Sequence, residues 1–552
     1  MSEQYYGVTI GPVFDTISAA KSPAGLWCAS YLFSWISREF CKKLLESGVK
    51  ETDIFSPFIA KDAPARKDGV GCYPDRMYFR ADSGFEKALG ELIAGMKSAV
   101  AAEFGKSLTN LPEARLQDFF DRYLLFYEAH MDVDNAENQM RAGEKNPIPV
   151  LNRYLNALEL SRPFVPEVSL NPIARLFGVS DDEVNQKGDQ AKGKNESIKR
   201  CFLLQKDETE TCQLRTNPKD SDSDLKQMKD IAARGQGEHG GSENVEWKRY
   251  RYCAVVNADG DSMGKVLDGF PPEKTREFSK ACLDYGAEVS KKISDYGGVT
   301  IYAGGDDLLF LAPLDGTTMT AAKECSSDDS GKGKTETIFD LCEEISDIFS
   351  RSFKKICKGT EHSEPTVSFG ISAHYYRFPL YESQRDAKRL LEKAKEHGKN
   401  KNSLAFRLQK ASGIPLEFIA GNQSETLKQL KGLLNQSLEL ETKDDQTGRL
   451  LHSVIYKLDE FKSLFAKAQT LPQPEENQLQ PVFQNIFDSD VQKNDVMTNY
   501  LRSAQSLLRA LGEENTQADQ EKTSEVFWKN RIDTLGVCLR IAKFYTERAE
   551  EE

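Results

Sequence analysis

The run Tyr-Ala-Gly-Gly-Asp-Asp-Leu-Leu at residues 302–309 decides the fold expected for this chain. Two β-rich segments flank a Gly-Gly-Asp-Asp centre, which predicts a tight hairpin with two carboxylates at its tip. Gly304 and Gly305 permit positive φ and leave the backbone open to a ligand. Asp306 and Asp307 repel each other, and a hard cation such as Mg²⁺ relieves that repulsion. An ordinary solvated turn is the competing interpretation, because glycine and aspartate are common in turns.

A second acidic strand end lies upstream of this hairpin. The apolar strand expected at 251–257 runs into Asp-Gly-Asp-Ser-Met-Gly at 259–264. In a split β-α-β sheet the first strand lies beside the central hairpin, so Asp259 is expected near Asp306 and Asp307. Three carboxylates from two strands would hold two Mg²⁺ (or Mn²⁺) ions and a nucleoside triphosphate.

The turn after this strand offers a second kind of phosphate ligand. The backbone N–H groups between Gly260 and Gly264 are expected to bind phosphate oxygens. A helix cap is the competing interpretation for Asp261. Farther along, Lys395 and Lys399 are four residues apart near the end of a basic helix, so both would project toward phosphates if that face borders the site. Solvated lysines that favour a helix C-terminus are the alternative.

The order of expected elements sets the fold class. Residues 251–408 read strand, helix, strand, strand, helix, strand, followed by a further helix and strand, which is typical of a ferredoxin-like sheet. Residues 4–104 repeat the first five of these elements without the acidic hairpin. Residues 112–164 and the part beyond 413 are expected to be helical. We therefore predict an α+β protein with two ferredoxin-like domains, which resemble the palm of nucleotide cyclases, a helical intervening region and a C-terminal helical domain.

The expected domain limits follow from these patterns and from changes in composition. The four predicted parts are a first palm without catalytic residues (1–110), a helical region with a charged flexible insertion (111–246), a catalytic palm (247–412) and a C-terminal helical domain (413–552).

Composition narrows the class of protein. The chain has 552 residues and a formal net charge of -13, which argues against gripping nucleic acid by bulk positive charge. No run of eighteen apolar residues occurs, so we expect no membrane span and a cytoplasmic protein. Eleven cysteines without a C-x-x-C pair are typical of reduced thiols. Zinc binding by Cys201 and Cys212 is not indicated, because ten residues separate them.

Together the motifs resemble a known family. Their order resembles the nucleotide-cyclase palm and, more specifically, the large polymerase-like subunit of type III CRISPR effector complexes. The matching segments are 259–264, 304–307, 368–372 and 394–400. The Ser-Pro-Ala-Gly-Leu-Trp-Cys-Ala-Ser-Tyr-Leu run at 22–32 is similar to the Cmr (III-B) branch.

This resemblance implies an RNA-activated enzyme. Other Cmr-type subunits, crRNA and bound target RNA would switch on a palm that polymerises ATP into cyclic oligoadenylate, a second messenger in antiviral defence. It implies metal-binding, catalytic roles for Asp259, Asp306 and Asp307. It also implies that Lys395 and Lys399 contact the triphosphate and that Ser368 lies in the nucleotide pocket.

Two further functions stay open at this point. The same palm would join AMP to a non-nucleotide acceptor such as S-adenosylmethionine, since the motifs define the ATP and metal half of the site and not the acceptor. A non-catalytic scaffold is the third interpretation, and the clustered carboxylates count against it. None of the six histidines is followed by aspartate, so we expect no HD-type nuclease.

Overall fold

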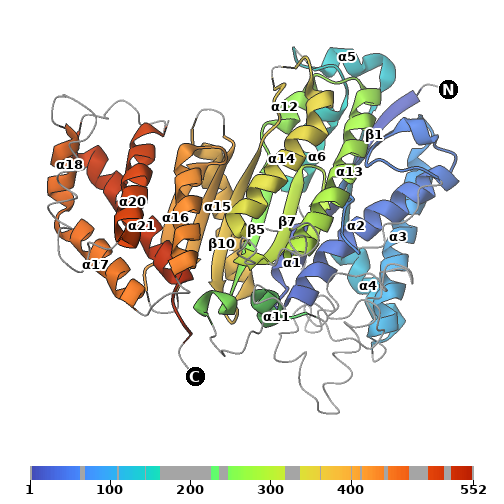
Figure 1. The fold of residues 1–552 in the computed structure, drawn as a ribbon. Helices are drawn as coiled ribbons and strands as arrows, with labels where there is room; N and C mark the ends of the chain where they lie inside the picture. Colours follow the sequence, from blue (N-terminus) through green and yellow to red (C-terminus); the bar gives the residue numbers. More distant parts are fainter. Residues whose placement is uncertain are drawn as a thin grey trace, which may run out of the picture.

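The computed structural model describes most of the chain. The described residues are 3–61, 69–108, 111–142, 144–161, 226–234, 247–316, 336–360, 362–398, 401–410, 413–440, 446–470, 495–514 and 524–549. An N-terminal part, a central sheet with its helices and a C-terminal group of helices lie in a row (Figure 1). Apart from 226–234, the expected insertion between 181 and 246 lies outside the described residues.

The N-terminal part is built around a four-stranded sheet with the order β2-β3-β1-β4. Strand β1 pairs antiparallel with both β3 and β4. This is the strand order of a split β-α-β sheet, so the expected first palm is confirmed in topology. Its elements are β1 (Glu3–Gly11), α1 (Val13–Ser18), α2 (Pro23–Glu46), β2 (Ile54–Ser56), β3 (Arg76–Asp82), α3 (Glu86–Ser107), α4 (Glu113–Tyr123) and β4 (Leu125–Asp132).

Strand β4 corrects the expectation that residues 112–164 are wholly helical. It pairs with the full length of β1 from Gln4 to Gly11 and completes the first sheet. The expected limit at residue 110 therefore cuts this sheet. The strand is an edge strand with only Ala129 and Met131 buried, so its sequence lacks the strong apolar alternation that marks a central strand. Helices α5 (Ala136–Gln139) and α6 (Ile148–Leu160) follow it.

The central sheet has six strands in the order β12-β11-β10-β5-β7-β6. Its four strands β10, β5, β7 and β6 repeat the topology of the first palm, and all three of their pairings are antiparallel. The second palm is therefore confirmed. Its elements are β5 (Tyr252–Gly260), α12 (Met263–Asp268), α13 (Pro272–Tyr296), β6 (Val299–Gly304), β7 (Asp307–Pro313), β8 (Asp315–Gly316), β9 (Glu336–Thr337), α14 (Ile338–Cys357), β10 (Val367–Tyr375), α15 (Leu380–Glu396) and β11 (Ser403–Gln409).

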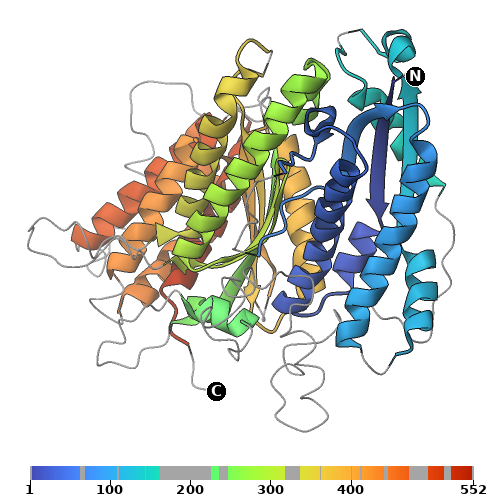
Figure 2. The ribbon, with the colours of Figure 1, turned by 90° about the vertical axis from the view of Figure 1, so that its right-hand side faces the viewer.

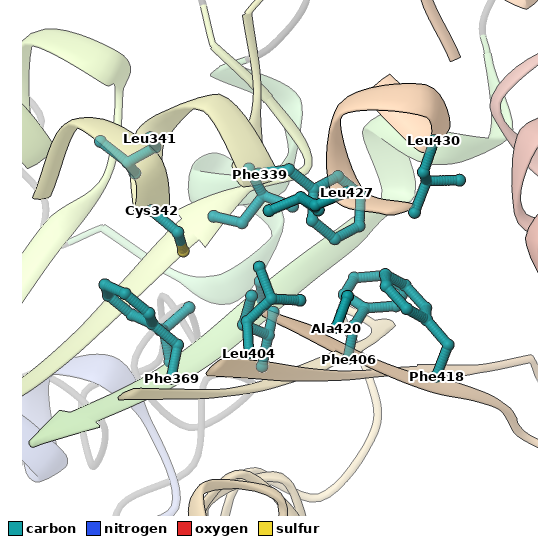
Figure 3. Close-up of a cluster of buried hydrophobic side chains, with 14 of the residues drawn as sticks. Phe339, Leu341, Cys342, Phe369, Leu404, Phe406, Phe418, Ala420, Leu427 and Leu430 are labelled. Carbon is teal, nitrogen blue, oxygen red and sulfur yellow. The ribbon is translucent and has the colours of Figure 1, made fainter. Parts of the chain in front are cut away.

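Strand β12 (Leu416–Gly421) corrects the expectation of helices alone beyond residue 413. It pairs antiparallel with β11, so the sheet continues past the expected limit at 412. Side chains of β11 and β12 pack beneath α14 and α16 (Glu425–Leu440) in one aromatic cluster (Figure 3). The ring of Phe339 lies 5.0 Å from that of Phe406 and 5.7 Å from that of Phe418. This cluster joins the palm to the C-terminal helices.

The second sheet is covered on both faces. Along β5 the side chains alternate: Ala254 and Val256 belong to the core beneath α13 and α14, whereas Cys253 and Val255 belong to the core shared with the first palm. That second face is covered by α2, by α11 (Met228–Ala233) and by α15. Helix α2 lies alongside the second palm in the view of Figure 2 and contacts β6. Because side chains on both faces of β5 are buried, its sequence is a continuous apolar run.

The C-terminal helices return to the palm at the end of the chain. They are α16, α17 (Gln446–Glu460), α18 (Lys462–Thr470), α20 (Asp495–Glu513) and α21 (Glu525–Tyr545). Arg249, just before β5, forms a buried ion pair with Asp315 at 2.5 Å and donates to the carbonyl oxygen of Tyr545. The described helices include none that is both long enough and apolar enough to cross a bilayer.

Gly370 tests how closely α15 is packed on the sheet. A Cβ at this position of β10 would collide with the carbonyl oxygen of Ala387 and the amide nitrogen of Leu391 in α15. We expect Gly370→Ala to lower the free energy of unfolding by about 3 kcal/mol, because neither backbone atom can move without displacing the helix. Urea denaturation measures the effect. Gly90→Ala in α3, where no atom lies within 4 Å, is the control and should stabilise by up to about 1 kcal/mol. Equal effects of the two changes would contradict this packing.

Candidate active site

Strand alternation directs two of the three predicted aspartates into the same space. Asp259 has the parity of Val255 in β5, and Asp307 has the parity of Leu311 in β7; both partner residues face the first palm. The register pairs Ala258 with Leu308, so the two acidic strand ends are adjacent. Both aspartates line one cavity. The structure therefore brings together residues that are 48 positions apart in the sequence.

Asp306 lies at the hairpin tip between this cavity and the opposite face. A Cβ at Gly260 would be 2.9 Å from the Cβ of Asp306 and 2.7 Å from Phe349 of α14. The carboxyls of Asp306 and Asp259 are close enough to interact through a hydrogen bond. Gly260 therefore allows the hairpin tip to lie against the end of β5, and any side chain there would push the carboxylates apart. Gly305, at φ 68°, forms the turn.

The cavity has a volume of about 470 Å³ and lies between the two palms. From the second palm, its wall includes Asn257, Asp259, Tyr302, Asp307 and Lys395. From the first palm, it includes Val13, Ile17, Ser30, Phe33, Tyr73 and Asp75. Sequence reasoning missed the residues of the first palm, because only tertiary packing places α1, α2 and the segment before β3 over the second sheet.

Lys395 lies in the last turn of α15 and forms an ion pair with Asp259. It thereby supplies positive charge at the acidic strand end, and its expected contact with a triphosphate stays a prediction. Lys399 lies outside the described residues, so its role stays a prediction. Lys388 lies two turns before Lys395 in α15. Its Nζ is 5.0 Å from the ring centre of Phe14 in α1, at the junction of the two palms.

The site carries more negative charge than its surroundings neutralise. Burial, followed by the charge of Asp259, raises the pKa of Asp306 to about 7. The pKa of Asp307 is raised too, first by its packed surroundings and then by Asp306 and Asp259. Lys395 opposes both shifts. A group of carboxylates with raised pKa values favours the binding of a cation or a proton.

The donor set of this site fits Mg²⁺ in its chemistry. Carboxylate oxygens are the ligands that Mg²⁺ prefers, and three aspartates meet at the two strand ends. As their side chains stand, however, the described residues hold no group of three His, Cys, Asp or Glu side chains gathered closely enough to bind a metal ion. Lys395 contacts one carboxylate oxygen of Asp259, Oδ2. Metal binding by Asp259, Asp306 and Asp307 remains a proposal.

Asp261 has a structural role that its sequence position did not reveal. Its carboxylate is buried and accepts hydrogen bonds from the hydroxyl of Thr366 (2.8 Å), the hydroxyl of Ser368 (2.9 Å) and the backbone N–H of Asn402 (2.9 Å). It thus joins the end of β5 to the starts of β10 and β11. Helix α12 has no side-chain cap, so the alternative that Asp261 caps it is wrong.

The same network changes the interpretation of two other predicted residues. Ser368 is fully buried, donates to Asp261 and does not line the cavity, and its expected place in the nucleotide pocket stays a prediction. Within the turn from Gly260 to Gly264, the N–H of Asp261 is already bonded to the carbonyl oxygen of Thr366 at 2.8 Å. Phosphate binding by this turn remains a prediction for its other N–H groups.

A Cβ at Gly264 would meet no atom within 4 Å, whereas one at Gly304 would collide with the ring of Tyr302.

The fold and the acidic strand ends define a nucleotide-cyclase-like palm paired with a second palm that lacks the acidic hairpin. Two models of known families match parts of this chain. Residues 252–405 match the family model "Cas10/Cmr2, second palm domain", and residues 5–66 match "CRISPR-associated protein Cmr2, N-terminal". The resemblance to the large subunit of type III-B (Cmr) complexes is thereby confirmed.

Individual relatives are similar to this chain at low sequence identity. The chain is 25% identical over 189 residues to the CRISPR system Cmr subunit Cmr2 of Pyrococcus furiosus; the alignment covers 30% of this chain and 19% of the relative. The apo type III-B Cmr-beta structure matches with TM-score 0.50 and 13% identity over 84% of this chain and 75% of that chain. A Csm1–Csm4 cassette in complex with cA4 matches with TM-score 0.51 and 13% identity over 99% and 70%. These two structures show a shared fold.

The raised pKa of Asp306 predicts how metal-free protein responds to pH. A folded-state pKa of about 7 lies above the ordinary value of 3.8, so this group's contribution to stability is complete below about pH 4 and is lost as the pH rises through 7. Asp306→Asn mimics the protonated form. In EDTA, the melting temperature of Asp306→Asn minus that of the wild type should therefore increase as the pH is raised from 4 to 7.

Added Mg²⁺ should stabilise the wild type at pH 8 and stabilise Asp306→Asn much less. Asp284→Asn, on the exposed side of α13, is the control and should behave as the wild type under every condition. Differential scanning calorimetry measures all three proteins. A difference between Asp306→Asn and the wild type that does not change with pH would show that Asp306 titrates as it does in the unfolded chain.

The buried position of Asp261 leads to a separate prediction. Asp261→Ala removes the common acceptor of two hydroxyls and of the half-buried backbone N–H of Asn402. We expect the free energy of unfolding to fall by about 3 kcal/mol. Asp284→Ala should change it by less than about 0.5 kcal/mol. Chemical denaturation of the two variants compares them, and a small effect of Asp261→Ala would mean that water replaces the carboxylate.

Proposed function

We propose that this chain is the ATP-using subunit of an RNA-guided type III CRISPR complex and that it synthesises cyclic oligoadenylate. The observation that carries the proposal is the cavity between the palms, where Asp259, Asp307 and Lys395 share one wall. The matched family models support the type of palm. One solved relative is a Csm1–Csm4 cassette in complex with cA4, which makes a cyclic tetra-adenylate a reasonable product class.

In the proposed reaction, Asp259, Asp306 and Asp307 hold Mg²⁺. When bound, this ion supplies positive charge for the triphosphate and lowers the pKa of the attacking hydroxyl. The 3′-hydroxyl oxygen of one ATP bonds to the α-phosphorus of another, pyrophosphate leaves, and the hydroxyl proton passes to water. Lys395 exchanges its contact with Asp259 for the phosphate oxygens and so orients the leaving group.

The first palm closes the cavity and limits the access of water to the reacting groups. Apolar side chains of α1 and α2 form that wall, among them Val13, Ile17 and Phe33. A low-polarity wall strengthens each charge interaction inside the site. The net charge of -13 leaves crRNA and target RNA to be bound through partner subunits of the Cmr type. We therefore expect activity in the assembled complex rather than in the isolated chain.

The proposal predicts complete dependence on the aspartates of the hairpin. Asp306→Ala combined with Asp307→Ala should abolish product formation by the RNA-activated complex, by at least about 10³-fold, while leaving assembly intact. Mass spectrometry of the products and size-exclusion chromatography of the complex measure the two effects. Asp284→Ala is the control and should retain full activity.

The same assay separates the competing functions. Ring-shaped oligoadenylates formed from ATP alone would reject transfer of AMP to S-adenosylmethionine. A product that appears only when S-adenosylmethionine is added would reject oligoadenylate synthesis. Unchanged synthesis by the double variant would reject the assigned active site, and no nucleotide product from the activated wild-type complex would leave the scaffold function.

A further inference from the structure

The first palm contributes an acidic side chain to the cavity. Asp75 lies just before β3 and lines the same cavity as Asp259 and Asp307. Its charge acts on Asp307 across this space. Asp75 thus adds a carboxylate to those of Asp259, Asp307 and Glu392, and it comes from the palm that was expected to carry no catalytic residues.

The segment that carries Asp75, residues 69–75, is held rigidly. Its backbone is bonded to α2, β1 and β6 rather than to water. These bonds are Trp27 Nε1 to the oxygen of Gly69 (2.7 Å), the N–H groups of Cys72 and Tyr73 to Ser34 Oγ (2.9 and 3.0 Å), Ser37 Oγ to the oxygen of Pro74 (2.6 Å), the N–H of Ile10 to the oxygen of Asp75 (3.0 Å) and the N–H of Ala303 to the oxygen of Gly71 (2.8 Å). A carboxylate on such a segment is fixed in place before any ligand binds.

Among the described residues Asp75 forms no ion pair, although the charge of the neighbouring Arg76 acts on it. The neighbouring Arg76 is directed instead to Glu159, at 3.1 Å, and to Asn152 and Asn156. Lys395 is engaged by Asp259. A half-buried carboxylate without an ion pair is stabilised when a bound ligand donates a hydrogen bond to it.

The chemistry of the cavity indicates which part of a nucleotide makes that contact. Phosphate groups would be repelled by Asp75, and they have a cationic partner in Lys395. The wall of the same cavity includes the aromatic residues Phe33 and Tyr73 of the first palm, and flat aromatic surfaces suit a nucleobase. Adenine has an exocyclic amino group that donates hydrogen bonds, which a carboxylate accepts.

We infer that Asp75 accepts a hydrogen bond from the exocyclic amino group of an adenine base held in the cavity between the palms, and that it thereby selects adenine nucleotides. This inference rests on the proposed ATP-using function and adds a specificity-determining residue from the first palm. Inosine triphosphate, which has a carbonyl oxygen in place of the amino group, would present that oxygen to the carboxylate and be repelled.

Asp75→Asn tests this contact because asparagine has the same size and can either accept from an amino group or donate to a carbonyl. In the RNA-activated complex with the full chain, the ratio of kcat/KM for ATP to that for inosine triphosphate should fall by about tenfold or more. The ratio of kcat/KM for ATP to that for 2′-deoxy-ATP should stay unchanged. Because both nucleotides are measured on the same protein, the ratio does not depend on the fraction that folds. Asp82→Asn, exposed at the other end of β3, is the matched control and should leave every ratio as in wild type.

The outcomes separate this inference from the proposed function. An active wild type whose nucleotide preference is unchanged by Asp75→Asn would overturn the inference alone. A change in the 2′-deoxy-ATP ratio instead of the inosine ratio would also overturn it, since Asp75 would then contact the ribose. If the wild-type complex forms no product, the proposed function fails, and displacement of a fluorescent ATP analogue by ATP and by inosine triphosphate tests the base contact. In that binding assay too, an unchanged ratio in Asp75→Asn overturns the inference.

Discussion

The repulsion among aspartates at the ends of β5 and the β6–β7 hairpin is the constraint on which the rest of the site depends. Gly260 removes the side chain that would separate Asp306 from β5, and Asp261 fixes the strand end through three hydrogen bonds. Lys395 balances one carboxylate. A backbone glycine, a buried polar network and a lysine therefore all serve to keep the like-charged aspartates together. Such an arrangement is reasonable only where the aspartates bind a cation and its ligand.

The local part of this arrangement could be predicted from the sequence. The Gly-Gly-Asp-Asp hairpin, the acidic end of β5 and the basic end of α15 each have a residue pattern with a mechanism, and their order indicated a split β-α-β sheet. The strands that were missed, β4 and β12, lie at sheet edges, where a strand needs little apolar alternation because one side is unpaired. Strand β4 pairs with β1, which lies far away in the sequence. Strand β12 pairs with β11, the strand that precedes it.

The roles of residues that depend on tertiary packing were harder to predict from the sequence. Ser368 matched a family motif, yet its hydroxyl serves the buried Asp261 and not the cavity. Asp75 belonged to no motif, and only the docking of the first palm on the second sheet places it opposite Asp307. A duplicated palm thus has two uses in one chain: one copy carries the acidic strand ends, and the other forms the wall that faces them.

The extension of the second sheet by β12 has a consequence for how this protein can be divided. Phe406 of β11 and Phe418 of β12 share one cluster with Phe339 of α14, so the palm and the first C-terminal helix bury the same apolar surface. A fragment that stops at residue 412 would leave β11 as an open edge and expose these rings to water. Such a fragment would recruit strands from other molecules and aggregate, whereas a cut made after α16 spares both the edge and the cluster.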